Sequence, residues 1–231
     1  MGCDIHFYTE RRNTVTGQWE FVGEVIREGD WVTANSLYDG RNYNLFAILA
    51  NVRNGRGFAG VKTGEGFEPI SFPRGVPPDA SAEYKSLSDQ MDGDGHSHSY
   101  LTLRELLDYD WTQTSKLQGW VKIEQWLDWS RWDRGQGYGP NSYCGGVSGA
   151  GVVHLSASQM DELTKGKIYL RGEERTKFLE ENPNTYALAE WKTPYYRAAG
   201  NFVSETIPEL LKLAGGVSGV EDVRVVFFFD N

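Results

Sequence analysis

The first residues whose types and spacing suit chemistry are Asp4 and His6. They are separated by one residue within residues 3–10, a segment whose composition favours a strand. Residues two apart in a strand point to the same face, so the carboxylate and the imidazole can converge on one ion. Carboxylates and imidazoles both bind divalent transition metals such as zinc, manganese and iron. The pair is therefore a candidate part of a metal site.

A second candidate for the same chemistry is the pair His96 and His98, which follows Gly95. Together with Asp4 and His6, these imidazoles would hold a metal that lowers the pKa of a bound water for hydrolysis. The two pairs resemble the first and last metal motifs of calcineurin-like phosphoesterases. The middle motifs of those enzymes, Gly-Asp-x-x-Asp and Gly-Asn-His, are absent here. The alternative, which we keep open, is that all four side chains are ordinary polar groups of a strand and a loop.

Arginine and amide side chains flank a short apolar segment, residues 43–52, which predicts a buried helix. Guanidinium groups form paired hydrogen bonds with phosphate or carboxylate, and an aromatic ring can stack on a base. Amide groups at a helix start favour the same anions. The candidate residues for binding a small anionic, nucleotide-like ligand are Arg41, Asn42, Tyr43, Arg53, Asn54 and Arg56. The alternative is that the amides cap turns and the arginines pair with surface acids.

Two further segments combine residue types that are common in binding sites. Residues 135–151 contain seven glycines and predict a long loop, which either covers a ligand or is a plain connection. Residues 111–132 contain five of the eight tryptophans, and Trp126, Trp129 and Trp132 recur at helical spacing. These rings predict core packing, a contact between copies in a homo-oligomer, or a surface that binds another protein.

Hydrophobic periodicity and capping residues predict the elements that position these groups. A turn over residues 13–17 joins the first two strands into an N-terminal β-hairpin. Thr102 and Glu105 have the spacing of a capping box, and Ser156 or Ser158 begins a short helix. The expected strands cover residues 3–10, 19–27, 186–192 and 223–229, the expected helices cover residues 43–52, 80–91, 102–109 and 195–213, and residues 92–99 are expected to form turns.

The C-terminal part of the chain predicts a strand–helix–strand crossover. Pro208 falls inside the helix and should kink it or split it in two. Such a crossover places its two strands parallel in one sheet, while the N-terminal hairpin adds antiparallel pairing. The sequence therefore predicts an α+β fold with a mixed sheet and a C-terminal β-α-β unit. We expect a single domain over residues 1–231, with loop insertions at about 53–79 and 111–185.

Composition and charge exclude several function classes. The 231 residues carry a net charge of −9, which is unlike a polybasic protein that binds double-stranded nucleic acid. No apolar run reaches the roughly 18 residues of a membrane span, and the first residues lack the pattern of a signal peptide. Cys3 and Cys144 lie far apart in the sequence, which favours a reducing compartment. We expect a soluble cytoplasmic protein.

Four blocks of the sequence resemble a family of uncharacterised proteins from tailed phages and prophages. The similarity covers residues 1–6 (MGCDIH), residues 41–54, residues 96–103 (HSHSYLTL) and residues 223–231 (VRVVFFFDN). The resemblance implies a context, the cytoplasm of a host cell, and no mechanism. Phage accessory proteins of this size often counter host defence, some of them by trapping or cleaving nucleotide signals.

Three hypotheses about function follow from these patterns. The first is an accessory protein that binds and sequesters a small anionic, nucleotide-like ligand. The second is a phosphoesterase that uses a divalent transition metal as cofactor. The third is a protein-interaction module that uses the tryptophan-rich segment.

Overall fold

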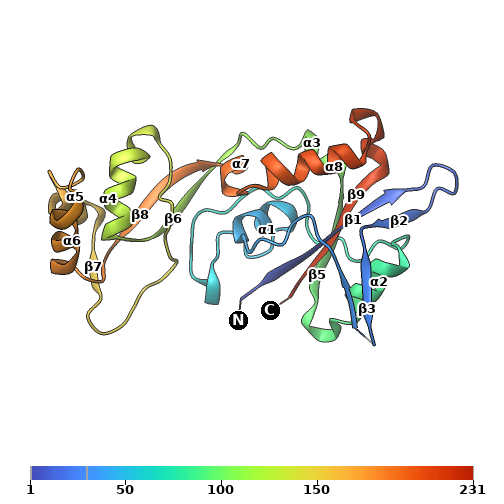
Figure 1. Ribbon diagram of the computed structural model, residues 1–231, viewed down its shortest axis with the longest axis horizontal. Coiled ribbons are helices and arrows are strands. Elements are labelled where there is room, and N and C mark those ends of the chain that lie inside the picture. Colours follow the sequence, from blue (N-terminus) through green and yellow to red (C-terminus); the bar gives the residue numbers. More distant parts are fainter. Residues whose placement is uncertain (1, 30, 231) are drawn as a thin grey trace. The chain divides into compact units, whose positions relative to one another are not determined.

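The chain folds into two units that interleave along the sequence. A computed structural model describes residues 2–29 and 31–230, and its helices and strands are drawn in Figure 1. The segments in which the sequence predicts insertions overlap most of the second unit, and the expectation of a single domain stays a prediction. The first unit comprises Met1–Asn54, Phe67–Thr112 and Tyr195–Asn231, and the second comprises Gly55–Gly66 and Gln113–Pro194.

The apolar run near the C-terminus is the centre of the main sheet, as predicted. It forms strand β9 (Val223–Asp230), in which every residue before Asp230 is buried. Strands β1 (Asp4–Arg12) and β5 (His96–Thr102) pair with its two edges, both antiparallel. Strand β2 (Trp19–Val22) pairs antiparallel with β1 and completes the order β2-β1-β9-β5. The predicted N-terminal hairpin and the α+β class are thereby confirmed.

One face of this sheet is covered by a helix and a second hairpin. Helix α2 (Ala82–Asp89), with strands β3 (Val25–Glu28) and β4 (Trp31–Ala34), supplies the covering side chains. The buried rings of Tyr84 and Phe228 belong to the resulting apolar cluster. Burial of this surface provides most of the driving force that holds these elements on the sheet.

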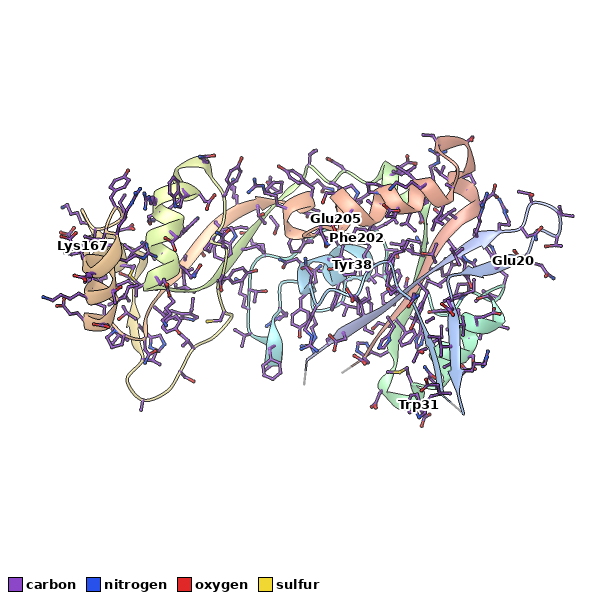
Figure 2. The ribbon with its side chains drawn as sticks, in the orientation of Figure 1. Glu20, Trp31, Tyr38, Lys167, Phe202 and Glu205 are labelled. Carbon is purple, nitrogen blue, oxygen red and sulfur yellow. The ribbon has the colours of Figure 1, made fainter. Side chains whose placement is uncertain are left out.

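The opposite face is covered by helix α1 (Tyr43–Ala50). The ring of Phe46 lies 5.0 Å from that of Phe229, edge to face. Further along the same face, the rings of Tyr38 and Phe202 lie 5.5 Å apart (Figure 2). Edge-to-face pairs of this kind add a modest specific attraction to the apolar burial.

The single strand expected over residues 19–27 is wrong, because two strands occupy this stretch. Gly23 separates β2 from β3 with a φ of +129°, a backbone conformation that favours glycine. The chain leaves β1 at this glycine, and β3 pairs with β4 instead.

The turn-rich segment expected over residues 92–99 is also partly wrong. It begins with a short 3₁₀ helix, Asp92–Asp94, but β5 starts at His96 and pairs with β9. A bulge between His96 and Ser99 remains in that pairing, with Ser97 at a φ of +51°. Pairing with the central strand has overridden the local turn propensity.

The second unit contains a mixed three-stranded sheet with the order β6-β8-β7. Strand β6 (Thr114–Lys122) pairs antiparallel with β8 (Thr185–Pro194), and β7 (Val153–Leu155) pairs parallel with β8. Three helices accompany this sheet: α4 (Ile123–Trp132), α5 (Ala157–Thr164) and α6 (Gly172–Glu181).

The expected C-terminal β-α-β unit is wrong. Strands β8 and β9 belong to different sheets, and both neighbours of β9 are antiparallel to it. Between them lie α7 (Tyr195–Ala198), a π-helical turn (Phe202–Thr206) and α8 (Ile207–Leu213). Pro208 stands at the start of α8, so the predicted split of this helix is confirmed.

Local capping signals are confirmed in both units. Thr102 and Glu105 form a capping box at the start of α3 (Leu103–Asp108). Ser156 and Gln159 form another at the start of α5.

The remaining short 3₁₀ helices are Phe58–Gly60, Arg134–Gln136 and Val217–Asp222. Among the described residues, no helix is long and apolar enough to cross a membrane.

Candidate functional site

The start of β1 and the end of β9 bring three ionisable side chains together. Asp4 lies opposite Asp230 in the strand register, and its backbone N–H donates to the Asp230 carboxylate over 3.2 Å. His6 Nε2 lies 3.1 Å from the other carboxylate oxygen of Asp230. Asp230 therefore bridges the two residues that the sequence proposes as a metal pair.

The partner of the Asp4 side chain is Arg41. The Nε and Nη2 atoms of the guanidinium donate to the two carboxylate oxygens over 2.6 and 2.5 Å. These hydrogen bonds hold the pKa of Asp4 below its ordinary value and raise the pKa of Arg41. The two side chains are 47% and 56% exposed, so the pair is open to solvent.

Asn42 positions helix α1. Its side-chain oxygen accepts from the backbone N–H groups of Asn44 and Leu45, which makes it the N-cap. Its amide nitrogen donates to the Ala198 carbonyl over 2.8 Å. Both ends of the amide group are thus used within the first unit, and Asn42 fits the capping alternative rather than ligand binding.

Tyr43, Arg53 and Cys3 lie close together beside α1. The Arg53 guanidinium lies 5.0 Å over the Tyr43 ring, and the Tyr43 hydroxyl accepts from the Cys3 backbone N–H over 3.1 Å. The helix ends at Asn51 in the left-handed conformation, which brings the following residues, including Arg53, back along the helix. Burial raises the pKa of the Cys3 thiol, and a hydrogen bond from Arg53 offsets part of that rise.

The other two predicted ligand residues have different roles. Asn54 donates to the carbonyl of Phe67 and accepts from its backbone N–H, each over 2.7 Å, so it holds a loop in place. Arg56 belongs to the second unit and donates to the Gly60 carbonyl over 3.2 Å. Of the six predicted ligand residues, three remain as candidates: Arg41, Tyr43 and Arg53.

We call the residues gathered at this end of the sheet the strand-end cluster. The Arg41 guanidinium is paired with the Asp4 carboxylate, the Arg53 guanidinium lies over the Tyr43 ring, and the Cys3 thiol is held in the neutral form by burial. The arrangement suits reversible binding of an anion by exchange with a carboxylate, and it offers no activated nucleophile. The cluster consists of Cys3, Asp4, His6, Arg41, Tyr43, Arg53 and Asp230.

The histidines proposed as metal ligands do not share one pocket. His6 and His98 each stack on the ring of Phe228, with centroid distances of 4.6 and 5.1 Å. His96 instead stacks on Phe229, whose side chain points to the opposite face of the sheet. The bulge in β5 causes this divergence, because it shifts the alternation of side chains between the two faces.

Each histidine proposed as a metal ligand has a protein partner on one ring nitrogen. His98 Nε2 lies 2.8 Å from the Ser88 hydroxyl, and burial lowers the pKa of His98. His96 Nδ1 lies 3.0 Å from the Ser97 hydroxyl, while its buried Nε2 has no partner among the described residues. Across residues 2–29 and 31–230, no three His, Cys, Asp or Glu side chains are arranged to hold a metal ion.

The glycine-rich loop is packed against the second sheet. Gly119 and Gly139 leave room for the rings of Tyr143 and Trp191 respectively, since an added Cβ would lie within 2.5 Å of each ring. Cys144 continues the contact through backbone hydrogen bonds with Trp120. These contacts favour the interpretation of residues 135–151 as a plain structured connection. Cys144, like Cys3, is a free thiol.

The tryptophans of α4 divide into two kinds. Trp126 and Trp129 are buried, with their rings edge to face at 5.3 Å, and they form core. Trp132, at the end of the helix, is 60% exposed. The interpretation as core is therefore correct for the first two rings and not for the third.

A separate cavity of about 480 Å³ lies beside β2 and the start of α2. The rim carries Glu20 and Glu83, so the cavity repels anions. One wall is Trp19, whose ring packs on the buried Arg224 at 4.1 Å. That guanidinium is neutralised by Glu10 and by Asp79. This cavity is not the place for the predicted anionic ligand.

The sequence patterns do not identify two members of the strand-end cluster, Asp230 and Cys3, as candidate site residues. Asp230 reaches the cluster because its strand ends opposite Asp4. This contact could be predicted only if the first and last strands were known to pair antiparallel, and no pattern in the residues near Asp230 indicates that pairing. Cys3 is apolar in character and gives no sign of its contact with Arg53.

Comparison with protein-family models, with characterised proteins and with solved structures gives no match to this chain.

Proposed function

We propose that the chain binds a small anionic, nucleotide-like ligand at the strand-end cluster. The observation that carries this proposal is the arrangement around Tyr43, where one guanidinium lies over the ring and another stands two residues before it. A tyrosine ring beside two arginines offers a stacking surface together with two phosphate donors. In the context that the resemblance to phage proteins implies, sequestration of the ligand is the biological role we propose.

Exchange of partners at Arg41 is the central step of the proposed binding. The carboxylate of Asp4 now takes two parallel hydrogen bonds from this guanidinium. A phosphate group presents oxygens with the same geometry and a larger charge, so it can replace the carboxylate. The exposure of the pair gives a ligand direct access to it.

The second guanidinium fixes the orientation of the ligand. Arg53 lies against one side of the Tyr43 ring, and the Tyr43 hydroxyl is tied to the Cys3 backbone, so the ring is held in one position. A pre-positioned ring and guanidinium lose little conformational entropy when a ligand binds. Arg53 therefore strengthens a phosphate contact that Arg41 initiates.

Calorimetry with a panel of cyclic and linear nucleotides, and with inorganic phosphate, tests this proposal. We expect one saturable site, with affinity lowered about tenfold in both Arg41→Gln and Arg53→Gln, as for loss of a charge-assisted hydrogen bond. Arg104→Gln is the matched control, because Arg104 is a surface arginine of the same unit that pairs with Glu221. Absence of binding across the panel, or an equal loss in the control, would refute the proposal.

A further inference from the structure

A second aromatic and cationic surface lies in the second unit, separate from the strand-end cluster. Trp132 ends α4, and Tyr169 lies in the segment that joins α5 to α6. The Arg131 guanidinium lies 4.4 Å from the centroid of the Trp132 ring and 5.6 Å from that of Tyr169. We call these three residues the Arg131 stack. The two rings are 60% and 67% exposed.

The neighbouring Arg134 has a structural role in this unit and serves as a comparison for Arg131. Arg134 also lies over tryptophan rings, Trp126 at 4.8 Å and Trp129 at 5.0 Å. Those rings are buried, and Asp161 neutralises the guanidinium. Arg134 therefore has a structural role, because its charge is paired with Asp161 and its guanidinium packs on buried rings.

Arg131 differs from its neighbour in each respect. Within the described part of the chain it forms no ion pair, and its Nε atom is buried without a hydrogen-bond partner. A guanidinium retains its full positive charge at any physiological pH. The stack therefore presents an unneutralised cation between two exposed rings, a combination that suits a flat anionic ligand.

Further cations flank Tyr169 along the chain. Lys167 and Arg171 precede and follow it by two residues, and neither pairs with a carboxylate in the described residues. The Lys167 ammonium lies 5.2 Å over the Phe178 ring (Figure 2 marks Lys167). Lys167 and Arg171 therefore add positive charge within two residues of Tyr169 in the sequence.

The charge of the whole chain is unevenly divided between the two units. The first unit contains eleven Lys and Arg against twenty-one Asp and Glu, and the second contains twelve against eleven. The net charge of −9 therefore combines −10 in the first unit with +1 in the second. The acidity that argues against a polyanion belongs to the first unit and leaves the second free to bind one.

We propose that the Arg131 stack binds single-stranded nucleic acid. Unpaired bases stack on Trp132 and Tyr169, while Arg131, Lys167 and Arg171 contact the phosphates. A nucleic acid strand supplies flat rings and negative charges in alternation, and aromatic platforms beside basic residues recognise such strands without strong sequence preference. A duplex cannot bind in this way, because its bases are already stacked on one another.

Fluorescence anisotropy with a short labelled thymidylate strand tests this proposal on the full chain. We expect Trp132→Ala and Tyr169→Ala each to weaken binding about tenfold, as for loss of one stacked base. We expect Arg131→Gln to weaken binding and to reduce its dependence on salt concentration. Trp31→Ala is the matched control, because Trp31 is a 63% exposed tryptophan of the first unit. Unchanged thermal unfolding of each variant shows that the fold is retained.

Each remaining outcome overturns the proposal. The proposal fails if the strand does not bind, or if binding persists in the Trp132 and Tyr169 variants. It also fails if the matched duplex binds as tightly, which indicates general electrostatic attraction, or if thymidine monophosphate does, which indicates a mononucleotide site. Binding that is lost in Arg41→Gln assigns the strand to the strand-end cluster instead.

Discussion

In the ion pair of Asp4 and Arg41, the Asp4 carboxylate occupies the guanidinium that we propose as the anion-binding group. Exposed ion pairs contribute little to stability, so this contact does not need to persist for the chain to stay folded. Its paired geometry is nevertheless that of a guanidinium bound to an oxyanion. Asp4 acts in the proposed function as an internal competitor that a ligand must displace.

Removing the Asp4 carboxylate therefore tests whether a ligand displaces it from Arg41. We expect Asp4→Asn to tighten binding of inorganic phosphate or a nucleotide by up to about fivefold, because an exposed ion pair is a weak competitor. Calorimetry measures the change. Asp222→Asn is the control, because Asp222 pairs with Arg12 in a similar surface contact away from the cluster. Weaker binding in Asp4→Asn would contradict partner exchange.

Residue types along the sequence were sufficient to find Arg41, Tyr43 and Arg53, but not to tell them from Asn42 and Asn54. The difference lies in hydrogen-bond satisfaction. Both amides donate to and accept from backbone groups, some of them more than ten residues away in the sequence. Whether an amide serves the fold or a ligand depends on which backbone groups the tertiary structure brings to it.

The start of helix α1 depends on a single side chain, that of its N-cap Asn42. We expect Asn42→Ala to lower the free energy of unfolding by about 0.5–2 kcal/mol through loss of the N-cap. Urea denaturation measures the change. Asn42→Asp keeps the cap oxygen and loses the amide donor to Ala198, so it should retain most of the stability. Equal losses in both variants would show that the amide contact matters more than the cap.

The bulge in β5 changes what the spacing of His96 and His98 means for the positions of their side chains. His96 and His98 are two residues apart, which in a regular strand places both on one face. The extra residue at the bulge sends one ring to Phe229 and the other to Phe228, on opposite faces. The spacing that predicted a shared metal thus describes two separate packing contacts. Bulges depend on pairing with the neighbouring strand, so the spacing alone could not reveal this one.

At the scale of the whole molecule, burial of ionisable groups limits the pH range of stability. Burial lowers the pKa of His98 and raises that of Tyr84, so both prefer their neutral forms in the folded state. The stability from His98 is present above its ordinary pKa of 6.5 and is lost as the pH falls below it. The stability from Tyr84 is present below its ordinary pKa of 10 and is lost as the pH rises above it.

We therefore expect the greatest stability between about pH 7 and 9.5, with losses on both sides. Urea denaturation of the wild type across pH 5–11 measures the profile. His98→Gln keeps a polar partner for Ser88 and should flatten the acid side relative to the wild type. Tyr84→Phe should flatten the alkaline side. Parallel profiles for wild type and His98→Gln between pH 7 and 5 would rule out the assigned role of His98.

Patterns along the sequence were enough to predict the local features of this protein: the central apolar strand, the N-terminal hairpin, the capping boxes and the break of the C-terminal helix at Pro208. Each of these features depends on residues close together in the chain, so their propensities and periodicity can be recognised in the sequence. Tertiary structure alone decided that β8 and β9 join different sheets, that Asp230 meets Asp4, and that the negative charge gathers in one unit. These features follow from contacts between distant segments, which depend on the apolar surface buried across the whole chain.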